Sequence, residues 1–290
     1  MKVQRRRFIA ASAGFAAASA LCRPAIAQTK KLHFGVGPLL PSPDDTKKAY
    51  APVFAHLAKE LGADFDLVST TDWAGMAVAM GSGQLDVAWM GPWGYVLANK
   101  EGEAQAIATV KYDGKPFYHA IIVGRPDLKI AKWPDDAKGM SISFADRGST
   151  SGWLIPTWWF KTKEIDPKSF FRYREGASHP ANETAVANGQ VDLATDYDRN
   201  LNSMIERNLI GKDAVKIVWT SDPLPNDALV VRKGFDPTLT EKVRQAALAI
   251  TENDAKTIMP VHYTGWIAAT HASYKMIEDA GVAVGIIKPK

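Results

Sequence analysis

The chain has 290 residues, 46% of them hydrophobic, with 35 basic residues against 31 acidic ones. Beyond position 27 there remain 30 basic and 31 acidic residues, a balance that excludes the basic surface typical of nucleic-acid binding. Cys22 is the only cysteine, so no disulfide within the chain can stabilise it. The core must do so, and about 260 residues are enough to form one, commonly as two lobes.

The first residues are typical of an export signal. Lys2 and three arginines precede an apolar run of small residues that ends in Ala25-Ile26-Ala27, a cleavage pattern. The stretch at 5–9, RRRFI, resembles a twin-arginine export motif. We therefore expect residues 1–27 to be a signal peptide that is removed, and the mature protein to lie in the periplasm. A leucine before Cys22 argues against a lipid anchor.

Strand-like and helix-like segments then alternate, which is the pattern of a mostly parallel sheet flanked by helices. The expected strands are 31–37, 66–70, 85–90, 106–111, 119–123, 140–144, 191–195, 215–220 and 229–232. The expected helices are 44–61, 73–80, a segment after Pro92, 153–162, 182–188, 239–251 and 272–280. We predict an α/β fold in which 28–120 with 225–290 form one lobe and 121–224 the other, with hinge strands between them. A ligand then lies between the lobes, on loops that lead from strands into helices.

Two of these loops carry tryptophans. In Thr70-Thr71-Asp72-Trp73, Asp72 has the position of a helix N-cap, and Trp73 either packs in the core or forms a wall of a ligand site. In Gly91-Pro92-Trp93-Gly94, two glycines allow a close backbone approach, so Trp93 lies either in a structural turn or in the cleft.

The loop Arg147-Gly148-Ser149-Thr150-Ser151-Gly152 places three hydroxyls at the start of a helix. One hydroxyl is enough for a cap, and a cap remains one interpretation. Three hydroxyls beside the free amides and positive dipole end of a helix favour a binding site for a phosphate-like anion.

Three further loops hold titratable groups. His179 precedes a helix and either donates to an anion or lies at the surface as a cap. Asp196 and Asp198 without a histidine cluster are weak evidence for a metal, and an ion pair with Arg199 is the simpler explanation. Asp227 lies in a turn and has the residue type of a turn former. We expect no metal, no cofactor and no catalytic residue.

A secreted serine-type hydrolase is the main alternative. It would use Ser149 or Ser151 with His179, although the sequence has no G-x-S-x-G elbow. A binding protein for another small solute, such as a sulfonate, is a second alternative.

Several stretches together resemble the phosphate-, phosphite- and phosphonate-binding proteins of bacterial ABC importers. They are TDWAGM at 71–76, GQLDVAWMGP at 83–92, STSG at 149–152 and AVANGQVD at 185–192. The resemblance extends from Leu32 to Ala280, and GPWGYVL at 91–97 and GWLIP at 152–156 are most similar to the hypophosphite/phosphite-binding branch. It implies a two-lobed periplasmic binding protein of the second type, most simply a monomer, that delivers its ligand to a permease in the inner membrane.

The same resemblance implies a set of ligand-binding residues. The family binds phosphorus oxyacids with an S-T-S motif, which corresponds to Ser149, Thr150 and Ser151. A tyrosine after a Gly/Pro turn corresponds to Tyr118, and an aromatic residue that is tyrosine in phosphonate binders is Trp73 here. The family histidine corresponds to His179, a position at which the hypophosphite branch departs from the family, and the family aspartate corresponds to Asp227.

Specificity is expected to depend on Arg199, with Asp196 close to it. Binders of 2-aminoethylphosphonate have a glutamate at the position of Arg199, where it holds the ammonium group. An arginine repels that group and offers it no acceptor. The resemblance therefore implies a ligand without a basic tail: phosphite, hypophosphite or methylphosphonate.

Overall fold

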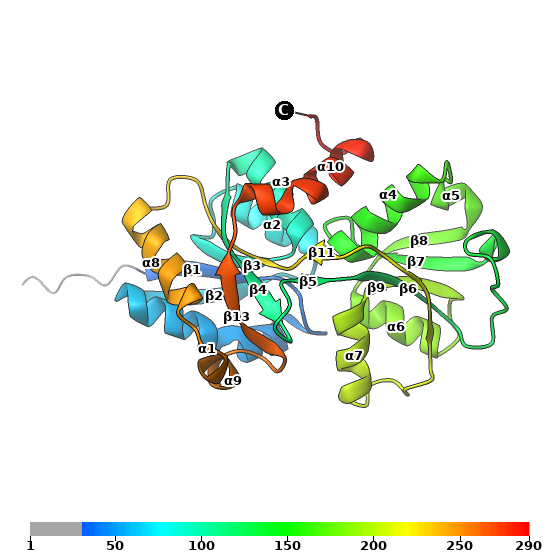
Figure 1. Ribbon diagram of the computed structural model, residues 1–290, viewed down its shortest axis with the longest axis horizontal. Helices are drawn as coiled ribbons and strands as arrows, with labels where there is room; N and C mark the ends of the chain where they lie inside the picture. The colour runs from blue at the N-terminus through cyan, green and yellow to red at the C-terminus, as the bar shows by residue number, and fades with distance from the viewer. Residues whose placement is uncertain (1–30, 290) are drawn as a thin grey trace, which may run out of the picture.

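The computed structural model describes residues 31–289, and the expected signal peptide and Cys22 lie outside the described residues. The chain forms two α/β lobes side by side, joined by extended segments (Figure 1). Within the described range, no helix combines the length and the hydrophobicity that crossing a membrane requires.

The first lobe is built on a six-stranded sheet with the order β13-β4-β12-β3-β1-β2. Its strands are β1 (Lys31–Val36), β2 (Asp64–Ser69), β3 (Val87–Met90), β4 (Gln105–Tyr112), β12 (Ala228–Val231) and β13 (Tyr263–Ala268). Its helices are α1 (Pro43–Leu61), α2 (Trp73–Gly81), α3 (Pro92–Gly102), α8 (Pro237–Leu248), α9 (Glu252–Ile258) and α10 (Lys275–Ala283), with a 3-10 turn at His271–Tyr274. Strands β1, β2 and β3 are parallel, whereas β12 runs antiparallel between β3 and β4.

Helices cover both faces of this sheet, so its central strands are buried on both sides. In β3, Val87 and Trp89 point toward the cluster formed with α1 and α8, while Ala88 and Met90 point toward α2 and α3. This alternation follows from the two-residue period of a strand. It explains why 85–90 reads as a continuous apolar run rather than as an alternating one.

The second lobe has a five-stranded sheet with the order β10-β6-β9-β7-β8. Its strands are β6 (Ala120–Gly124), β7 (Ser141–Ala145), β8 (Arg172–Ala177), β9 (Leu193–Tyr197) and β10 (Lys216–Thr220). Its helices are α4 (Ile155–Thr162), α5 (Pro167–Phe170), α6 (His179–Ala187) and α7 (Asp198–Glu206), with a π-helical turn at Thr150–Leu154 that continues into α4 and a 3-10 turn at Asp135–Ala137. Strand β7 is parallel to β8 and β9, and β6 is antiparallel to β9.

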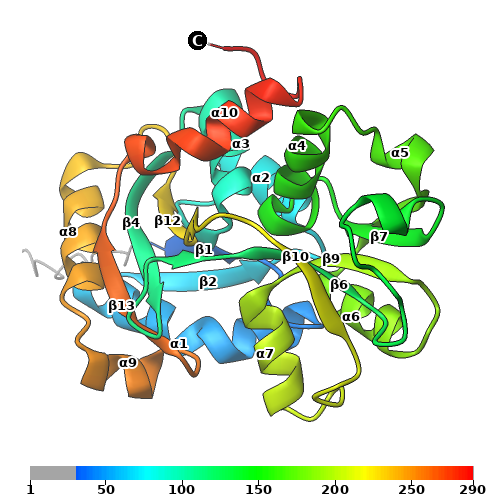
Figure 2. The same cartoon turned by 45° about the vertical axis from the view of Figure 1, so that its right-hand side comes forward.

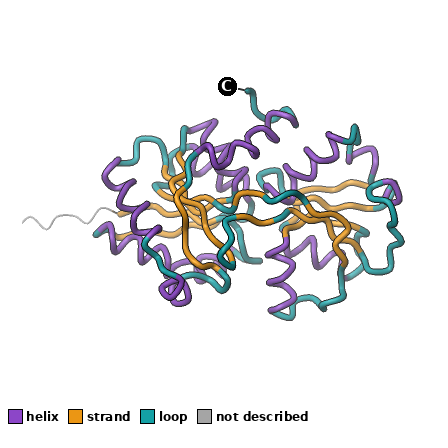
Figure 3. The backbone as a smooth tube through the Cα atoms, in the orientation of Figure 1, coloured by secondary structure: helices purple, strands orange, loops and turns teal. Residues whose placement is uncertain are grey.

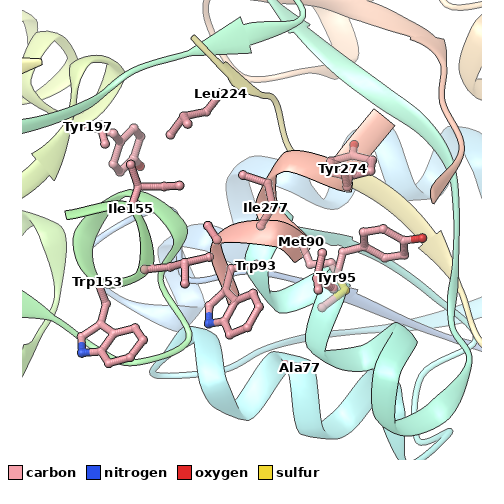
Figure 4. Close-up of a cluster of buried hydrophobic side chains, with 14 of the residues drawn as sticks. Ala77, Met90, Trp93, Tyr95, Trp153, Ile155, Tyr197, Leu224, Tyr274 and Ile277 are labelled. Carbon is pink, nitrogen blue, oxygen red and sulfur yellow. The ribbon is translucent and has the colours of Figure 1, made fainter. Parts of the chain in front are cut away.

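Two short antiparallel strands pair where the chain passes between the lobes (Figure 1). They are β5 (Phe117–Tyr118) and β11 (Leu224–Pro225). Figure 2 shows the two lobes turned, with α7 and α6 of the second lobe brought forward. One hydrophobic cluster extends across both lobes: Met90, Trp93 and Tyr95 come from the first, and Trp153 and Ile155 come from the second (Figure 4). The lobes are therefore in direct contact.

The predicted α/β architecture is confirmed, and the tube in Figure 3 shows helices around both sheets. The sheets are more mixed than a mostly parallel pattern implies, because the strands that follow each crossing pair in the antiparallel sense. Strands β8 and β13, helices α5, α7 and α9 and the two-residue strands β5 and β11 were not predicted from the sequence. Strand β8 is RYREGA, a polar strand with half its side chains exposed, so it lacks the apolar run by which the other strands were recognised.

Candidate functional site

A small cavity of about 20 Å³ lies between the two lobes. The first lobe contributes its loops after β1, β2 and β3 and the crossing strand β5, and the second lobe contributes the starts of the π-helical turn, α6 and α7. The cavity is lined by Leu39, Trp73, Gly91, Tyr118, Ser149, Thr150, Ser151, His179, Tyr197, Arg199 and Asp227. Seven of the eight expected ligand-binding residues, and Arg199, thus lie around one cavity.

The three adjacent hydroxyls have different partners. Ser149 is the N-cap of the π-helical turn, since its Oγ accepts from the Gly152 N–H at 3.0 Å. Thr150 Oγ1 accepts from the Trp93 N–H of the other lobe at 2.8 Å. The Tyr118 hydroxyl interacts with Thr150 and Ser151. The cap interpretation is therefore right for Ser149, while Thr150 joins the lobes and Ser151 lines the cavity.

Aromatic rings form much of the opposite wall. Trp73 is the first residue of α2, whose N-cap is Asp72, as predicted: the Asp72 carboxylate accepts from the Gly75 N–H at 2.7 Å. The Trp73 ring fills the space beside Gly37, where a Cβ would lie 2.3 Å from it. Tyr118 is also buried, and burial raises the pKa of its hydroxyl, so it stays a protonated donor.

Trp93 does not line the cavity. Its ring packs against α10, and its Nε1–H donates to the Arg147 carbonyl at 3.1 Å (Figure 4). As the second residue of α3, it points its side chain away from the cleft and only its backbone N–H toward Thr150. Of the two alternatives for Trp93, the ligand-binding role in the cleft is therefore wrong, and the structural one is right.

His179 is buried behind Ser149. Its Nε2 lies 2.9 Å from Ser149 Oγ, and its Nδ1 lies 2.7 Å from Asp196 Oδ1. Burial lowers the pKa of His179 to about 4, against the nearby carboxylates of Asp146 and Glu183, so the imidazole is neutral. Asp196 itself has no exposed surface and does not line the cavity. It reaches the hydroxyl of Ser149 through His179, and its charge also acts on Tyr197.

Arg199 and Asp227 form the charged end of the cavity. Arg199 Nη2 lies 3.7 Å from Asp227 Oδ1, and the Trp89 Nε1–H donates to Asp227 Oδ2 at 3.1 Å. The guanidinium carbon lies 4.6 Å from the centre of the Tyr118 ring and 5.4 Å from that of Tyr197.

The expected ion pair of Arg199 with Asp196 or Asp198 is wrong. Asp198 accepts backbone N–H groups of His119 and of Arg199 itself, while Asp196 points to the opposite side of β9, toward α6. Within residues 31–289, no group of three or more His, Cys, Asp and Glu side chains is placed to hold a metal ion.

A larger cavity of about 320 Å³ adjoins the first and shares Leu39, Tyr197 and Arg199 with it. Tyr50, Tyr112 and Tyr263 from the first lobe and α7 from the second lobe line it. Arg199 thus stands between a small polar cavity and a larger one rich in tyrosine.

The sequence analysis missed four residues of this region. Leu39 and Tyr197 line the cavity, Trp89 holds Asp227, and Glu183 lies behind Asp196. Tyr197 lies between two aspartates already considered, and Leu39 lies in the loop after the first strand, so the rule that ligands bind beyond strand ends could have identified both. Nothing local in the sequence marks Trp89 or Glu183.

The family model for the periplasmic substrate-binding protein of phosphonate ABC transporters matches residues 39–274. The chain belongs to this family. The phosphonates-binding periplasmic protein of Escherichia coli K12 is 31% identical over 231 residues, covering 78% of this chain and 68% of the relative. The phosphate-import protein PhnD of Mycolicibacterium smegmatis is 28% identical, covering 69% of this chain and 66% of the relative.

Among solved structures, PhnD1 from Prochlorococcus marinus in complex with methylphosphonate has a similar fold, with a TM-score of 0.77 at 19% identity, covering 89% of this chain and 99% of the other. The fold expectation of a two-lobed periplasmic binding protein is thereby confirmed. This protein is a periplasmic phosphonate-binding component of an ABC importer.

The contacts of His179 with Ser149 on one side and Asp196 on the other resemble the catalytic triad of a hydrolase, which was the enzymatic alternative. Ser149 lines the cavity, and its oxygen caps the π-helical turn by accepting the Gly152 N–H. Members of the family are binding components of transporters rather than enzymes.

Proposed function

We propose that this phosphonate-binding protein captures a small phosphorus oxyanion without a basic tail, namely phosphite, hypophosphite or methylphosphonate. The ligand is held between lobe 28–120 with 225–290 and lobe 121–224, and the monomeric protein presents it to an inner-membrane permease. Within the family, we assign the protein to the hypophosphite/phosphite-binding branch. Residues 1–27 direct export by the twin-arginine route and are then removed.

The observation that supports this proposal is the cavity between the lobes. Hydroxyl hydrogens of Thr150, Ser151 and Tyr118 and the first amides of the π-helical turn supply donors to the oxygens of an anion. The ring of Trp73 offers a P–H or P–CH₃ group a surface that needs no hydrogen bond. A volume of about 20 Å³ leaves little room beyond the head group itself.

Charged groups at the other end account for selectivity. Trp89 donates to Asp227 Oδ2, and Asp227 Oδ1, which lies 3.7 Å from Arg199, can accept from the protonated P–OH of phosphite or methylphosphonate. Hypophosphite, with one charge and two P–H groups, needs no acceptor there, whereas sulfate, a dianion without a proton at neutral pH, would place an oxygen against the carboxylate. A fourth oxygen, as in phosphate, would meet an apolar wall at a cost of about 1–3 kcal/mol, which is about 10- to 100-fold in affinity.

Arg199 occupies the position at which the resemblance places the glutamate that holds an ammonium group. It is buried, and its charge acts directly on the cavity it lines. An aminoalkyl substituent would lie beside this cation without an acceptor, so 2-aminoethylphosphonate is expected to bind weakly.

The test is calorimetry on the mature protein with phosphite, hypophosphite, methylphosphonate, phosphate, sulfate and 2-aminoethylphosphonate. At least one of the first three binds more tightly than all the others. Thr150→Val keeps the shape of the side chain but removes the hydroxyl. The affinity for the preferred ligand is expected to fall about 10- to 100-fold, because the hydrogen bond to the anion is lost and the buried Trp93 N–H loses its acceptor.

Ser169→Ala is the matched control, because this exposed serine of α5 lies outside the cavity. It leaves all affinities unchanged. Tighter binding of 2-aminoethylphosphonate, or of a sulfonate, than of the three proposed ligands would refute the proposal.

A further inference from the structure

A chain of buried polar side chains leads away from the cavity wall at Ser149. Ser149 Oγ is 2.9 Å from His179 Nε2, and His179 Nδ1 is 2.7 Å from Asp196 Oδ1, although these two atoms are not aligned as a hydrogen bond in this structure. The carboxyl of Glu183 acts on Asp196, and neither of its oxygens has an aligned hydrogen-bond partner among residues 31–289. His179 is 4% exposed, and Asp196 and Glu183 have no exposure at all.

The charged groups that face His179 and Asp196 within residues 31–289 are acids. Asp146 acts on His179 from the end of β7, Glu183 acts on both from α6, and Asp198 acts on Asp196 from the start of α7. The remaining partners are neutral: the Tyr197 ring lies edge-on to His179, and the Asn200 amide donates to Asp196 Oδ2 at 2.8 Å. Two carboxyls therefore share a dry site with a histidine and no cation among these partners.

The number of protons in this chain decides whether Ser149 is a donor toward the cavity. The Ser149 oxygen already accepts the Gly152 N–H, and it carries one hydrogen and one further lone pair. With one proton on the His179–Asp196 pair, the carboxylate 2.7 Å away attracts that proton to Nδ1. Nε2 then accepts the Ser149 hydrogen, and the serine turns a lone pair toward the cavity, which an anion would not tolerate.

A second proton reverses this arrangement. With Asp196 protonated, its hydrogen lies on Oδ1 beside Nδ1, which must then be unprotonated, so the imidazole carries its hydrogen on Nε2. Ser149 then accepts from both Nε2–H and Gly152 N–H, and its own hydrogen is free to point at the anion. The imidazole stays neutral throughout, and the net change is one proton added to Asp196.

We propose that anion binding in this pocket takes up one proton from solvent, that Asp196 receives it, and that Asp196 is the positioning residue that makes Ser149 a donor through His179. This inference rests on the proposed function, because it needs an anion beside Ser149. Beyond the proposed function, it states that each anion binds together with one proton, which Asp196 holds.

The electrostatics of the site agree with this assignment. Burial is the largest influence on both carboxyls and raises the pKa of Glu183 and of Asp196. Burial also lowers the pKa of His179, which favours a proton on Asp196 over a charged imidazolium. An anion entering beside Ser149 adds another negative charge and raises the affinity of Asp196 for a proton further.

Linkage fixes the direction of the pH dependence. Where the free protein has Asp196 ionised and the complex has it protonated, the affinity falls about tenfold for each pH unit of increase. Where both states are protonated, at lower pH, the affinity is constant. Hypophosphite is the probe of choice because it has no second ionisable proton near neutral pH, so its own charge does not change.

The experiment is calorimetry of hypophosphite binding at about pH 8 in two buffers of different ionisation enthalpy, which counts the protons taken up. The native sequence is expected to take up close to one. In Asp196→Asn the amide oxygen keeps the contact with Asn200 and the NH₂ group faces Nδ1, so the Nε2–H form is permanent. This variant is expected to take up no proton and to bind with an affinity that is independent of pH.

Glu183→Gln is the matched control. The amide has the shape and neutral charge of a protonated glutamic acid, so this variant is expected to keep the uptake of one proton. Loss of uptake in Glu183→Gln with retention in Asp196→Asn would move the proton to Glu183 and overturn the assignment. Binding without proton uptake by the native sequence would overturn the inference while leaving the proposed function intact.

A spectroscopic measurement covers the case in which a variant fails to fold. Nitrogen NMR of the histidines in the native sequence is expected to show Nε2 of His179 unprotonated in the free protein at about pH 8 and protonated in the complex. An unchanged His179 tautomer in a saturated complex would contradict the inference. If no phosphorus oxyanion binds at any pH, it is the proposed function that fails.

Discussion

The two lobes meet in two regions that are built differently. Around Thr150 the contact is tight and uncharged: Trp93 N–H donates to Thr150 Oγ1 at 2.8 Å, and its ring N–H donates to the Arg147 carbonyl at 3.1 Å. Around Arg199 the contact surrounds the larger cavity and is made by charged side chains. Arg199 lies 3.7 Å from Asp227, and His262 Nε2 lies 2.9 Å from Glu206 on α7.

The difference indicates a division of roles. Short hydrogen bonds that involve backbone groups set the distance between the lobes, and this distance places the donors around a small anion. Contacts between charges tolerate small movements and respond to pH and to the charge of a ligand substituent. We therefore expect changes at the first region to affect all ligands strongly, and changes at the second to affect selectivity or pH dependence by smaller amounts.

The largest effect is expected from Gly148→Ala. A Cβ at this position would lie 2.2 Å from the Ala74 backbone nitrogen of the other lobe, so the lobes cannot approach as they do here. If the closed form falls to about one per cent, the apparent Kd for every ligand rises about 100-fold. Calorimetry measures the loss.

Gly211→Ala is the control for that substitution, because its nearest neighbour is 3.9 Å away and its backbone has no positive φ. It should bind as the native sequence does. Native affinity in Gly148→Ala would mean that the contact around Thr150 is not required for binding.

A smaller, selective effect is expected from Arg199→Gln. The substitution removes the cation and supplies a carbonyl acceptor, so the affinity for 2-aminoethylphosphonate relative to methylphosphonate rises about tenfold, about 1.4 kcal/mol. Arg174→Gln makes the same charge change on the exposed side of β8, outside both cavities, and should leave that ratio unchanged. An identical shift in both variants would mean that net charge alone, not the position of Arg199, sets selectivity.

The smallest effect is expected at His262, which also interacts with Asp113 at 3.0 Å. Partial burial lowers its pKa, but the bonds with Glu206 and Asp113 raise it more, so the net pKa is above the usual value. A raised pKa stabilises the folded protein fully below the unfolded value of about 6.5, and this is lost as pH rises through the folded value. The contribution of such an accessible pair is at most about 1 kcal/mol.

His262→Asn removes the bridge but tolerates the positive φ of 74° at this position. Its Tm is expected to lie about 2–4 °C below that of the native sequence near pH 6, and the gap should close as the pH rises. A gap that widens with pH, followed by calorimetry or circular dichroism, would contradict this role of His262.

Much of the site could be inferred from local sequence because its residues occupy loops after strands. Asp72 caps α2, and Ser149 to Ser151 begin a helix, and both features are set by interactions within a few residues. Trp93 shows the limit of such inference. Its neighbours made a role in the cleft plausible, but the position of α10 decided that its ring packs inside the core.

The partners of charged residues were the least predictable feature. Asp196 and Asp198 lie within three residues of Arg199 in the chain, yet its ion pair is with Asp227 of the other lobe. Asp196 and Tyr197 point to opposite sides of β9, so adjacency in sequence separates their environments. Glu183 gained its importance only because α6 packs over the end of β9.

The sequence by itself determined the alternation of strands and helices, the helix caps and the family, because each depends on short-range periodicity or on motifs of a few residues. Only the tertiary structure decided which side chains enclose the cavity and which share a proton behind it. The physical reason is that these pairs lie about 30 residues apart in the chain. Ser149 meets His179 only when β7 and β8 pair in the second sheet, and Arg199 meets Asp227 only when the two lobes close on each other.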